Sequence, residues 1–458
     1  MSQSTPLNVI ILAAGQGTRM KSKLPKVLHP LGGKPLLAHV IDAANLLKPA
    51  KMVVVYGHGG QQVLDTINDS SIVWAEQKEQ LGTGHAVNQA MSDIDDKSIA
   101  LILYGDVPLI NSTTLSDLIN QAGNDSLGLL TVHLEDPTGY GRIARDQHGQ
   151  VKYIVEQKDA NSEELKISES NTGILAVNGA KLRHWLSQLK NNNAQGEYYL
   201  TDIIAMAVAD GVEVKTAHPA SETEVMGINS RSQLAMMERA FQRQNAEDLM
   251  AKGVTIIDPD RIEVRGDVEV GTDITIDVNV VLEGKVKIAD NVSIGANCVI
   301  RDSVIEAGVE IKPMCVIEEA TVGKEAIVGP YSRLRPGANL AGGNHIGNFV
   351  EIKNSNIGQG SKVNHLTYIG DTDMGSGVNI GAGTITANYD GANKHRTTIG
   401  DNVSTGSNTV LVAPVKAGQG ATIGAGTVLR KEAPAGELTL SVVKQKTIEG
   451  WKRPAKKK

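Results

Sequence analysis

The chain has 458 residues, a formal net charge of −6 and only two cysteines. A chain of this length predicts roughly two to four domains. The acidic balance disfavours nucleic acid as a partner, and two cysteines exclude a disulfide scaffold. The sequence contains no run of about 18 apolar residues, and its start, MSQSTPLNVI, lacks the pattern of a signal peptide. We therefore expect a soluble cytoplasmic protein without membrane or nucleic-acid partners.

Residues 1–230 alternate short apolar runs with segments of helical periodicity. The runs at 8–14, 51–56, 98–104 and 127–132 have the composition of buried strands, and residues 36–47 can form a helix that packs on a sheet. This alternation predicts an α/β domain with a mostly parallel sheet. Residues 231–252 then form the clearest helix, with Leu234, Met237, Phe241 and Leu249 near one stripe. We expect this helix to link two domains.

Residues 253–458 repeat with a period of six. Units such as IGANCV, IKPMCV, IGAGTI and IGDNVS begin with an aliphatic residue, often followed by glycine, and have a small residue or valine at position five. Hexapeptide repeats predict a parallel β-helix with positions one and five pointing inward and about eighteen residues in each coil. The narrow core explains why the chain has only 3 Trp, 9 Tyr and 2 Phe. Cys298 and Cys315 fall at inward positions of adjacent coils and are expected to be buried thiols.

One segment, 386–398, interrupts the hexapeptide pattern. A stacked coil cannot absorb such an insertion, so the segment should leave the body as a loop, and loops on rigid scaffolds often carry function. Lys394 lies near the far end of this loop. We hypothesise that it reaches a neighbouring subunit.

A glycine-rich turn directly follows the first predicted strand. In LAAGQGTRM, residues 12–20, two glycines allow close backbone approach to an anion, and Arg19 adds a positive charge. Lys26 is a second cation nearby. The motif lacks the lysine spacing of a P-loop and the third glycine of a dinucleotide fingerprint. It therefore predicts a phosphate site of another kind.

Two further strand ends belong with this turn. Asp106 follows the buried strand 98–104, at the sheet edge where α/β proteins place their ligands. A carboxylate beside a phosphate loop suggests Mg²⁺. The segment QLGTGHA, residues 80–86, supplies another glycine-rich loop at the start of a helix.

The hexapeptide half contains one cluster of polar residues. His365 occupies the third position of the unit VNHLTY, and a neutral imidazole suits removal of a proton from an attacking amine. Arg335, Lys353 and Lys394 could hold a substrate phosphate. Tyr368 and Asn379 project from the same stretch of coils.

These motifs resemble a known family. LAAGQGTRM, LPK, LGTGHA and YGDVP are similar to the sugar-nucleotide pyrophosphorylases. With the hexapeptide half, NNNAQGEYY at 191–199 and NYDG at 388–391, the whole chain resembles the bacterial bifunctional N-acetylglucosamine-1-phosphate uridyltransferase/glucosamine-1-phosphate acetyltransferases. The resemblance implies a Rossmann-like α/β nucleotidyltransferase domain, a linking helix and a left-handed parallel β-helix in a homotrimer.

The resemblance also implies two reactions that yield UDP-N-acetylglucosamine, a precursor of peptidoglycan and lipopolysaccharide. The C-terminal site acetylates glucosamine 1-phosphate with acetyl-CoA. The N-terminal site then transfers UMP from UTP to N-acetylglucosamine 1-phosphate and releases pyrophosphate. This second reaction requires positioning and charge neutralisation more than a base.

The family implies a role for each matching residue of the N-terminal site. Arg19 and Lys26 stabilise the triphosphate, and Asp106 and Asn229 bind Mg²⁺. The remaining matches contact the nucleotide and the sugar: Leu12, Ala13, Ala14 and Gly15, then Gln77, Gly82 and Thr83 at the uracil, and Tyr104, Gly105, Gly141, Glu156 and Asn171 at the ribose and sugar.

In the C-terminal site the resemblance makes His365 the general base. The matches to the sugar-phosphate contacts are Arg335, Lys353, Tyr368, Asn379 and Lys394. The matches to the acetyl-CoA contacts are Ala382, Asn388, Tyr389, Ser407 and Ala425. Where the family has an arginine toward CoA, this chain has Val442, with Lys444 two residues later.

Two other functions fit the same two-part architecture. One is a monofunctional sugar-nucleotide pyrophosphorylase with a structural or regulatory β-helix, as in ADP-glucose enzymes, and His365 with its cationic neighbours argues against it. The other is a non-enzymatic exchange or scaffold subunit like those of eukaryotic translation initiation. Intact Arg19, Lys26 and Asp106 argue against that function.

Overall fold

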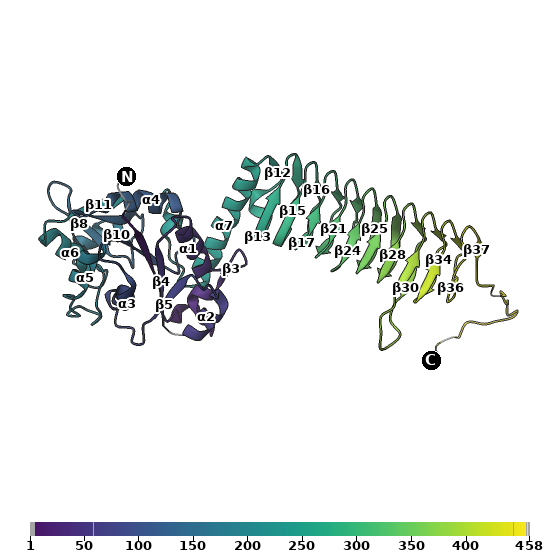
Figure 1. Cartoon of the computed structure of the whole chain (residues 1–458), viewed down its shortest axis with the longest axis horizontal. Helices are drawn as coiled ribbons and strands as arrows, with labels where there is room; N and C mark the ends of the chain where they lie inside the picture. The colour runs from purple at the N-terminus through teal and green to yellow at the C-terminus, as the bar shows by residue number, and fades with distance from the viewer. Residues whose placement is uncertain (1–4, 58, 443, 455, 457–458) are drawn as a thin grey trace. The chain divides into compact units, whose positions relative to one another are not determined.

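The computed structural model of the chain describes residues 5–57, 59–442, 444–454 and 456. Residues 1–4 lie outside the described part. They belong to the N-terminal segment in which the sequence analysis expects no signal peptide. The chain divides into two compact units, Met1–Phe241 and Gln242–Lys458. Figure 1 shows the first unit in purple to teal and the second in teal to yellow. Helix α7 (Arg231–Ala251) begins in the first unit and ends in the second.

The first unit is built on a nine-stranded sheet with the central order β11-β7-β10-β6-β1-β4-β5. Strand β1 pairs in parallel with β4 and β6, and β4 pairs in parallel with β5, whereas β10 runs antiparallel to β6 and β7. Strands β8 and β9 form an antiparallel hairpin beside β10. The bounds are β1 Leu7–Ala13, β4 Lys51–Tyr56, β5 Ile72–Glu76, β6 Ile99–Tyr104, β7 Ser126–His133, β8 Arg142–Arg145, β9 Val151–Val155, β10 Glu169–Asn178 and β11 Glu213–Ala217.

Helices cover both faces of this sheet. Alternate residues of β1 explain the division, because Val9 packs with α1, α2 and α4, whereas Ile10 packs with α3, α5 and α6. A strand buried on both faces must be apolar throughout, as the predicted strands are. The helices are α1 Leu36–Asn45, α2 Gly60–Ile67, α3 Thr83–Ala90, α4 Ser112–Gln121, α5 Gly179–Leu186 and α6 Asp202–Ala209, and a short hairpin joins β2 Pro30–Leu31 to β3 Lys34–Pro35. The predicted α/β fold is confirmed.

The second unit is a run of parallel strands from β12 (Val254–Ile256) to β37 (Leu438–Thr439), each paired with strands of neighbouring coils. Val281 pairs with Val299, eighteen positions further on, as the repeat predicts. This run is consistent with the expected left-handed β-helix. The strands used below are β18 Val304–Ile305, β23 Arg333–Leu334, β25 His345–Lys353, β27 Lys362–Gly370, β29 Asn379–Ile380, β30 Ile385–Ala387 and β31 Thr397–Ile399.

Side chains at positions one and five of each hexapeptide fill the core, as predicted. Ile294 and Cys298 of one unit are 2% and 0% exposed, and both cysteines are free thiols inside the prism. Position four turns the chain through the left-handed region, with φ of 59° at Asn297. Asparagine tolerates this conformation better than bulky residues do, which explains its recurrence at that position.

At one corner of the prism, four large apolar residues occupy this left-handed position. They form what we call the apolar corner row, consisting of Met314, Tyr331, Phe349 and Leu366 in successive coils, with φ between 48° and 64°. Their side chains are 44–65% exposed, and the rings of Tyr331 and Phe349 stack with centroids 5.4 Å apart. Bulky side chains in left-handed backbone are strained. The strain is not offset by burial within this chain.

No helix among the described residues is both long enough and apolar enough to cross a membrane.

Stacking of inward aliphatic residues should determine the stability of the second unit. Ile317 is fully buried between Ile300 and Leu334 of the neighbouring coils. We expect Ile317→Ala to lower the free energy of unfolding by about 2–5 kcal/mol, because it removes buried methylene groups and leaves a cavity. Val304→Ala, on the exposed face of β18, should cost less than about 1 kcal/mol. Urea unfolding followed by circular dichroism measures both, and equal losses would contradict the packing described.

Candidate functional site

A cavity of about 640 Å³ opens in the first unit where β1 and β6 end. Leu12 pairs with Tyr104 across these parallel strands, so the segments that follow them meet at one edge of the sheet. The cavity brings together most of the residues predicted for the N-terminal site: Leu12, Ala13, Ala14, Gly15, Arg19, Lys26, Gln77, Gly82, Thr83, Tyr104, Asp106 and Asn229.

The glycine-rich turn lies against the segment that carries the second cation. Gly17 has a φ of 60°, and a Cβ there would lie 2.7 Å from the Cβ of Lys26. A larger residue at this position would therefore push Lys26 away. The second glycine of the motif places Arg19 and Lys26 beside the same cavity.

The ammonium group of Lys26 lies between two oxygen atoms of the predicted metal ligands. Its Nζ is 2.5 Å from Oδ2 of Asp106 and 3.0 Å from Oδ1 of Asn229. Both oxygens therefore point at one position that a cation can occupy. They are hard donors of the kind Mg²⁺ prefers, and Mg²⁺ commonly combines one or two protein oxygens with substrate phosphates and water. The residues fit a divalent metal that the substrate helps to hold.

The described residues hold no cluster of three or more His, Cys, Asp or Glu side chains suited to a metal.

Gln77, which also lines the cavity, is buried, and its side-chain amide is held by two contacts. Its Nε2 donates to the carbonyl of Gly82 at 3.2 Å and lies 3.0 Å from Nδ1 of His85. Gly82, with a φ of 111°, precedes α3, and a Cβ there would lie 2.6 Å from the carbonyl oxygen of Tyr198. The backbone of Gly82 can therefore approach Tyr198 this closely only because Gly82 has no side chain.

Four predicted residues do not line this cavity. Gly105 donates its N–H to the carbonyl of Leu12 and holds the strand ends together. Gly141 accepts from the N–H of Asn171 at 2.8 Å. Glu156 lines a second cavity of about 380 Å³ and accepts from Oγ1 of Thr201. Burial raises the pKa of Glu156.

The cavity is also lined by residues that the sequence analysis assigned no role. Thr138, Gly139 and Tyr140 come from the loop between β7 and β8, and Thr172 comes from β10. The glycines of the segment TGYGR, residues 138–142, were a signal that could have indicated this loop. The others are Val27, Gln80, Ala86, Val107, Gln195, Glu197, Val225, Gly227 and Gln233.

In the second unit, the coils align His365 with three predicted acetyl-CoA residues. The carbonyl of His365 accepts from Gly383, that of Ala382 from Asn408, and that of Ser407 from Gly426. His365, Ala382, Ser407 and Ala425 thus precede the same corner in successive coils. Nδ1 of His365 lies 3.4 Å from Oδ1 of Asn348. With Nδ1 donating to this amide oxygen, Nε2 is left able to accept a proton.

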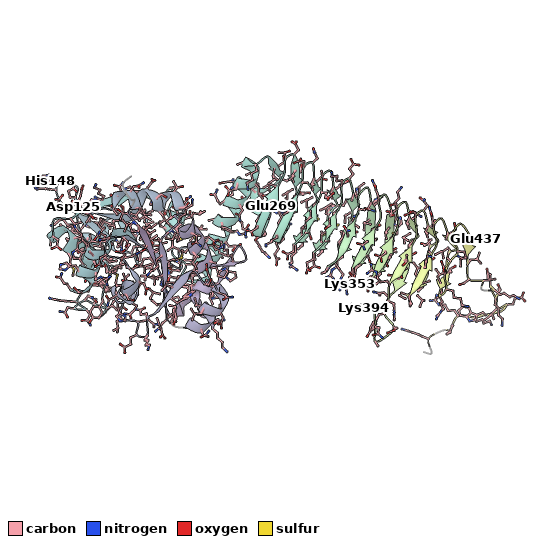
Figure 2. All side chains as sticks on the ribbon, in the orientation of Figure 1. Asp125, His148, Glu269, Lys353, Lys394 and Glu437 are labelled. Carbon is pink, nitrogen blue, oxygen red and sulfur yellow. The ribbon has the colours of Figure 1, made fainter. Side chains whose placement is uncertain are left out.

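The predicted phosphate cations gather on the other side of the Leu366 corner. Lys394 lies close enough to Lys353 to be the main cause lowering its pKa, with Arg335 contributing. Figure 2 shows Lys353 and Lys394 near one another on the β-helix. Nη1 of Arg335 donates to Oε1 of Glu351 at 2.7 Å. This hydrogen bond raises the pKa of Arg335, and Tyr368 contributes in the same direction. Two ammonium groups held together in this way favour a bound dianion.

The inserted loop leaves the body after β30, as predicted, and folds back as a hairpin (Figure 1). Tyr389 pairs with Lys394, and the N–H of His395 donates to the carbonyl of Asn388. Lys394 therefore returns to the base of the loop, beside Lys353 of its own chain. The hypothesis that Lys394 also reaches a neighbouring subunit stays a prediction, because this placement concerns a single chain.

A buried carboxylate orders the base of this loop. The oxygens of Asp371 accept from Nδ2 of Asn354 and Nδ2 of Asn388, both at 2.5 Å. These bonds, with Lys394 and Lys353, lower the pKa of Asp371 although its burial opposes this. Asn388 therefore has a fixed amide. Asn379 is exposed on β29, and Val442 is 84% exposed.

Residues 9–161 match the family of MobA-like NTP transferase domains. Over the full length, the chain is 59% identical to the bifunctional protein GlmU of Ralstonia pickettii, with 99% of both chains covered. It is 57% identical to that of Ralstonia nicotianae, with the same coverage. It is 58% identical to that of a Janthinobacterium species over 98% of this chain and 99% of the relative.

Removal of the Lys394 ammonium group should relieve the lowering of the pKa of Lys353. We expect Lys394→Ala to raise the pKa of Lys353 toward the ordinary lysine value, because the nearest positive charge is gone. Titration of the Lys353 side chain by NMR measures this. Lys416→Ala, which removes a lysine paired with Glu432 on a later coil, is the matched control and should leave this pKa unchanged. An unaltered pKa in Lys394→Ala would contradict the placement.

Proposed function

The chain belongs to the family of the bifunctional GlmU proteins, and from that premise we propose which residues carry each of its two reactions. It is a bifunctional enzyme of UDP-N-acetylglucosamine synthesis. It acetylates glucosamine 1-phosphate with acetyl-CoA and transfers UMP from UTP to N-acetylglucosamine 1-phosphate. The product is a precursor in cell-wall synthesis.

The cavity of the first unit is the proposed uridyltransferase site. The observation that supports it best is the convergence of Lys26, Asp106 and Asn229 beside the glycine-rich turn. Backbone groups at 12–15 hold the nucleotide, and the end at Gln77, Gly82 and Thr83 receives the uracil. Arg19 and Lys26 neutralise charge on the triphosphate while the sugar phosphate oxygen attacks the α-phosphorus in line.

Family members of the nucleotidyltransferase class generally depend on a divalent metal, and we assign Mg²⁺ to Asp106 and Asn229. Bound there, Mg²⁺ would neutralise phosphate charge and help orient the triphosphate. With a metal held by these two oxygens, Lys26 would no longer be needed between them. The released ammonium group becomes available to the phosphate chain, which gives this lysine its role when substrate binds.

We expect Asp106→Ala to lower UDP-sugar formation by at least about 10²-fold, because it removes the charged metal ligand. Acetylation should remain near the wild-type rate. Pyrophosphate release measures the first activity, and thiol release from acetyl-CoA measures the second. Asp117→Ala, an exposed carboxylate on α4, is the control and should change neither. Equal loss of both activities in a folded Asp106→Ala protein would refute separate sites.

The second unit supplies the proposed acetyltransferase site. Nε2 of His365 accepts the proton of the substrate amine as this attacks the thioester. Arg335, Lys353 and Lys394 bind the sugar phosphate, with Tyr368 and Asn379 along the sugar. The column from Ala382 through Ser407 to Ala425 receives acetyl-CoA, and Asn388 and Tyr389 lie at the acetyl group.

We expect His365→Ala to lower acetyl transfer by roughly 10²–10⁴-fold, the usual contribution of a positioned general base. UDP-sugar formation should be unaffected. His345→Ala, in strand β25 of the preceding coil, is the control. A His365→Ala enzyme with a normal rate would exclude this residue as the base.

Two further proposals concern the setting of the enzyme. We propose a homotrimer, and the exposed, strained apolar corner row beside His365 supports contact with another copy of the chain. We place the enzyme in the cytoplasm, where thiols stay reduced, because Cys298 and Cys315 lie in adjacent coils as free thiols. A monofunctional pyrophosphorylase is disfavoured, since the match to bifunctional proteins covers both units.

A further inference from the structure

Arg142, at the start of β8, is a cation buried inside the first unit. Arg142 is 2% exposed. Among the described residues, no carboxylate oxygen forms an ion pair with it within 4.0 Å. Its Nε also has no hydrogen-bond partner among the described residues. A buried guanidinium that makes no close ion pair is kept at a cost to the stability of the folded state. A buried charge of this kind is a candidate for a functional residue.

The two remaining nitrogen atoms of the Arg142 guanidinium, Nη1 and Nη2, both bind residues that hold one loop in place. We define the pocket loop as residues 137–141, between β7 and β8. Nη1 of Arg142 donates to the carbonyl oxygen of Tyr140, and Nη2 donates to Oε1 of Gln157 at 2.9 Å. The same Oε1 accepts from the N–H of Gly139 at 3.3 Å. Arg142 and Gln157 therefore clamp two consecutive residues of the pocket loop.

The pocket loop lines the main cavity through Thr138, Gly139 and Tyr140. Tyr140 lines the same cavity as Asp106, and burial together with the charge of Asp106 raises the pKa of Tyr140. The uracil end, at Gln77 and Gly82, is formed by other segments. The loop is thus placed to contact the group that attacks the nucleotide, and the clamp sets its position from outside the cavity.

We propose that Arg142 is a positioning residue for uridylyl transfer, which fixes the pocket loop against N-acetylglucosamine 1-phosphate. The inference rests on the proposed function of this cavity. Without Arg142, the carbonyl of Tyr140 loses its donor and Oε1 of Gln157 loses one of its two partners. The loop then samples positions in which the sugar phosphate is poorly held, whereas the nucleotide contacts stay intact.

Two variants separate the hydrogen bonds from the charge. Arg142→Lys keeps a cation but cannot donate in two directions from one planar group, and Arg142→Met keeps volume without charge. We expect both to raise the KM for N-acetylglucosamine 1-phosphate about 10–100-fold, the usual effect of losing a group that orients a binding residue. The KM for UTP and the rate of acetylation should stay near wild type.

Stability distinguishes positioning from a structural role. Replacement of an unpaired buried charge by an apolar side chain of similar volume is often neutral or stabilising. We therefore expect Arg142→Met to keep the melting temperature of the wild type while losing sugar-phosphate binding. Should Arg142→Met fail to fold, Arg142→Lys carries the same kinetic test. Gln157→Ala should act in the same direction, and the double variant should be no worse than Arg142→Met alone.

Arg145→Lys provides the matched control on the same strand. Arg145 pairs with Glu169 at 2.6 Å and does not line the cavity, so its variant should keep the wild-type KM for both substrates. An unchanged KM for the sugar phosphate in both Arg142 variants would overturn the proposal. An equal rise in the KM for UTP would also overturn it. A wild-type protein that forms no UDP-N-acetylglucosamine would instead refute the proposed function.

Discussion

Parallel pairing of β-strands is the constraint on which both sites depend. In the first unit, the register of Leu12 with Tyr104 brings the glycine-rich turn and Asp106 to one edge of the sheet. In the second unit, the stacking of coils places His365, Ala382 and Ser407 in one column. Parallel strands run in the same direction, so the segments that follow them lie side by side however far apart they are in the chain.

Several groups at these sites are held at a cost to stability. Lys353 and Lys394 bring two positive charges together, and Arg142 is buried without a carboxylate partner among the described ion pairs. A substrate phosphate can relieve the repulsion between the lysines. The hydrogen bonds of Arg142 are used on the loop that lines the cavity. The rigid sheet and prism supply the packing that keeps such groups in place.

The difference between inward and outward positions of the β-helix explains where the large side chains of the second unit lie. Its core accepts aliphatic residues and thiols such as Cys298, whereas the rings of Tyr331 and Phe349 project outward at strained corner positions. Inward positions therefore serve folding, and the apolar corner row is available for contact with another chain. The proposed catalytic histidine adjoins this row, which couples the proposed acetyltransferase site to assembly.

The sequence alone predicted the two architectures and many of the residues that line the first cavity. Apolar runs and a period of six predict the sheet and the β-helix because burial requires those periodicities. Motifs that follow strands predict the cavity residues because strand ends share an edge. Contacts between segments without a periodic pattern were decided only by the tertiary structure. The return of Lys394 to Lys353 depends on a hairpin, and the clamp from Arg142 to Tyr140 depends on burial. Neither the path of a loop nor the partner of a buried charge is encoded in local spacing, because both are set by packing between distant parts of the chain.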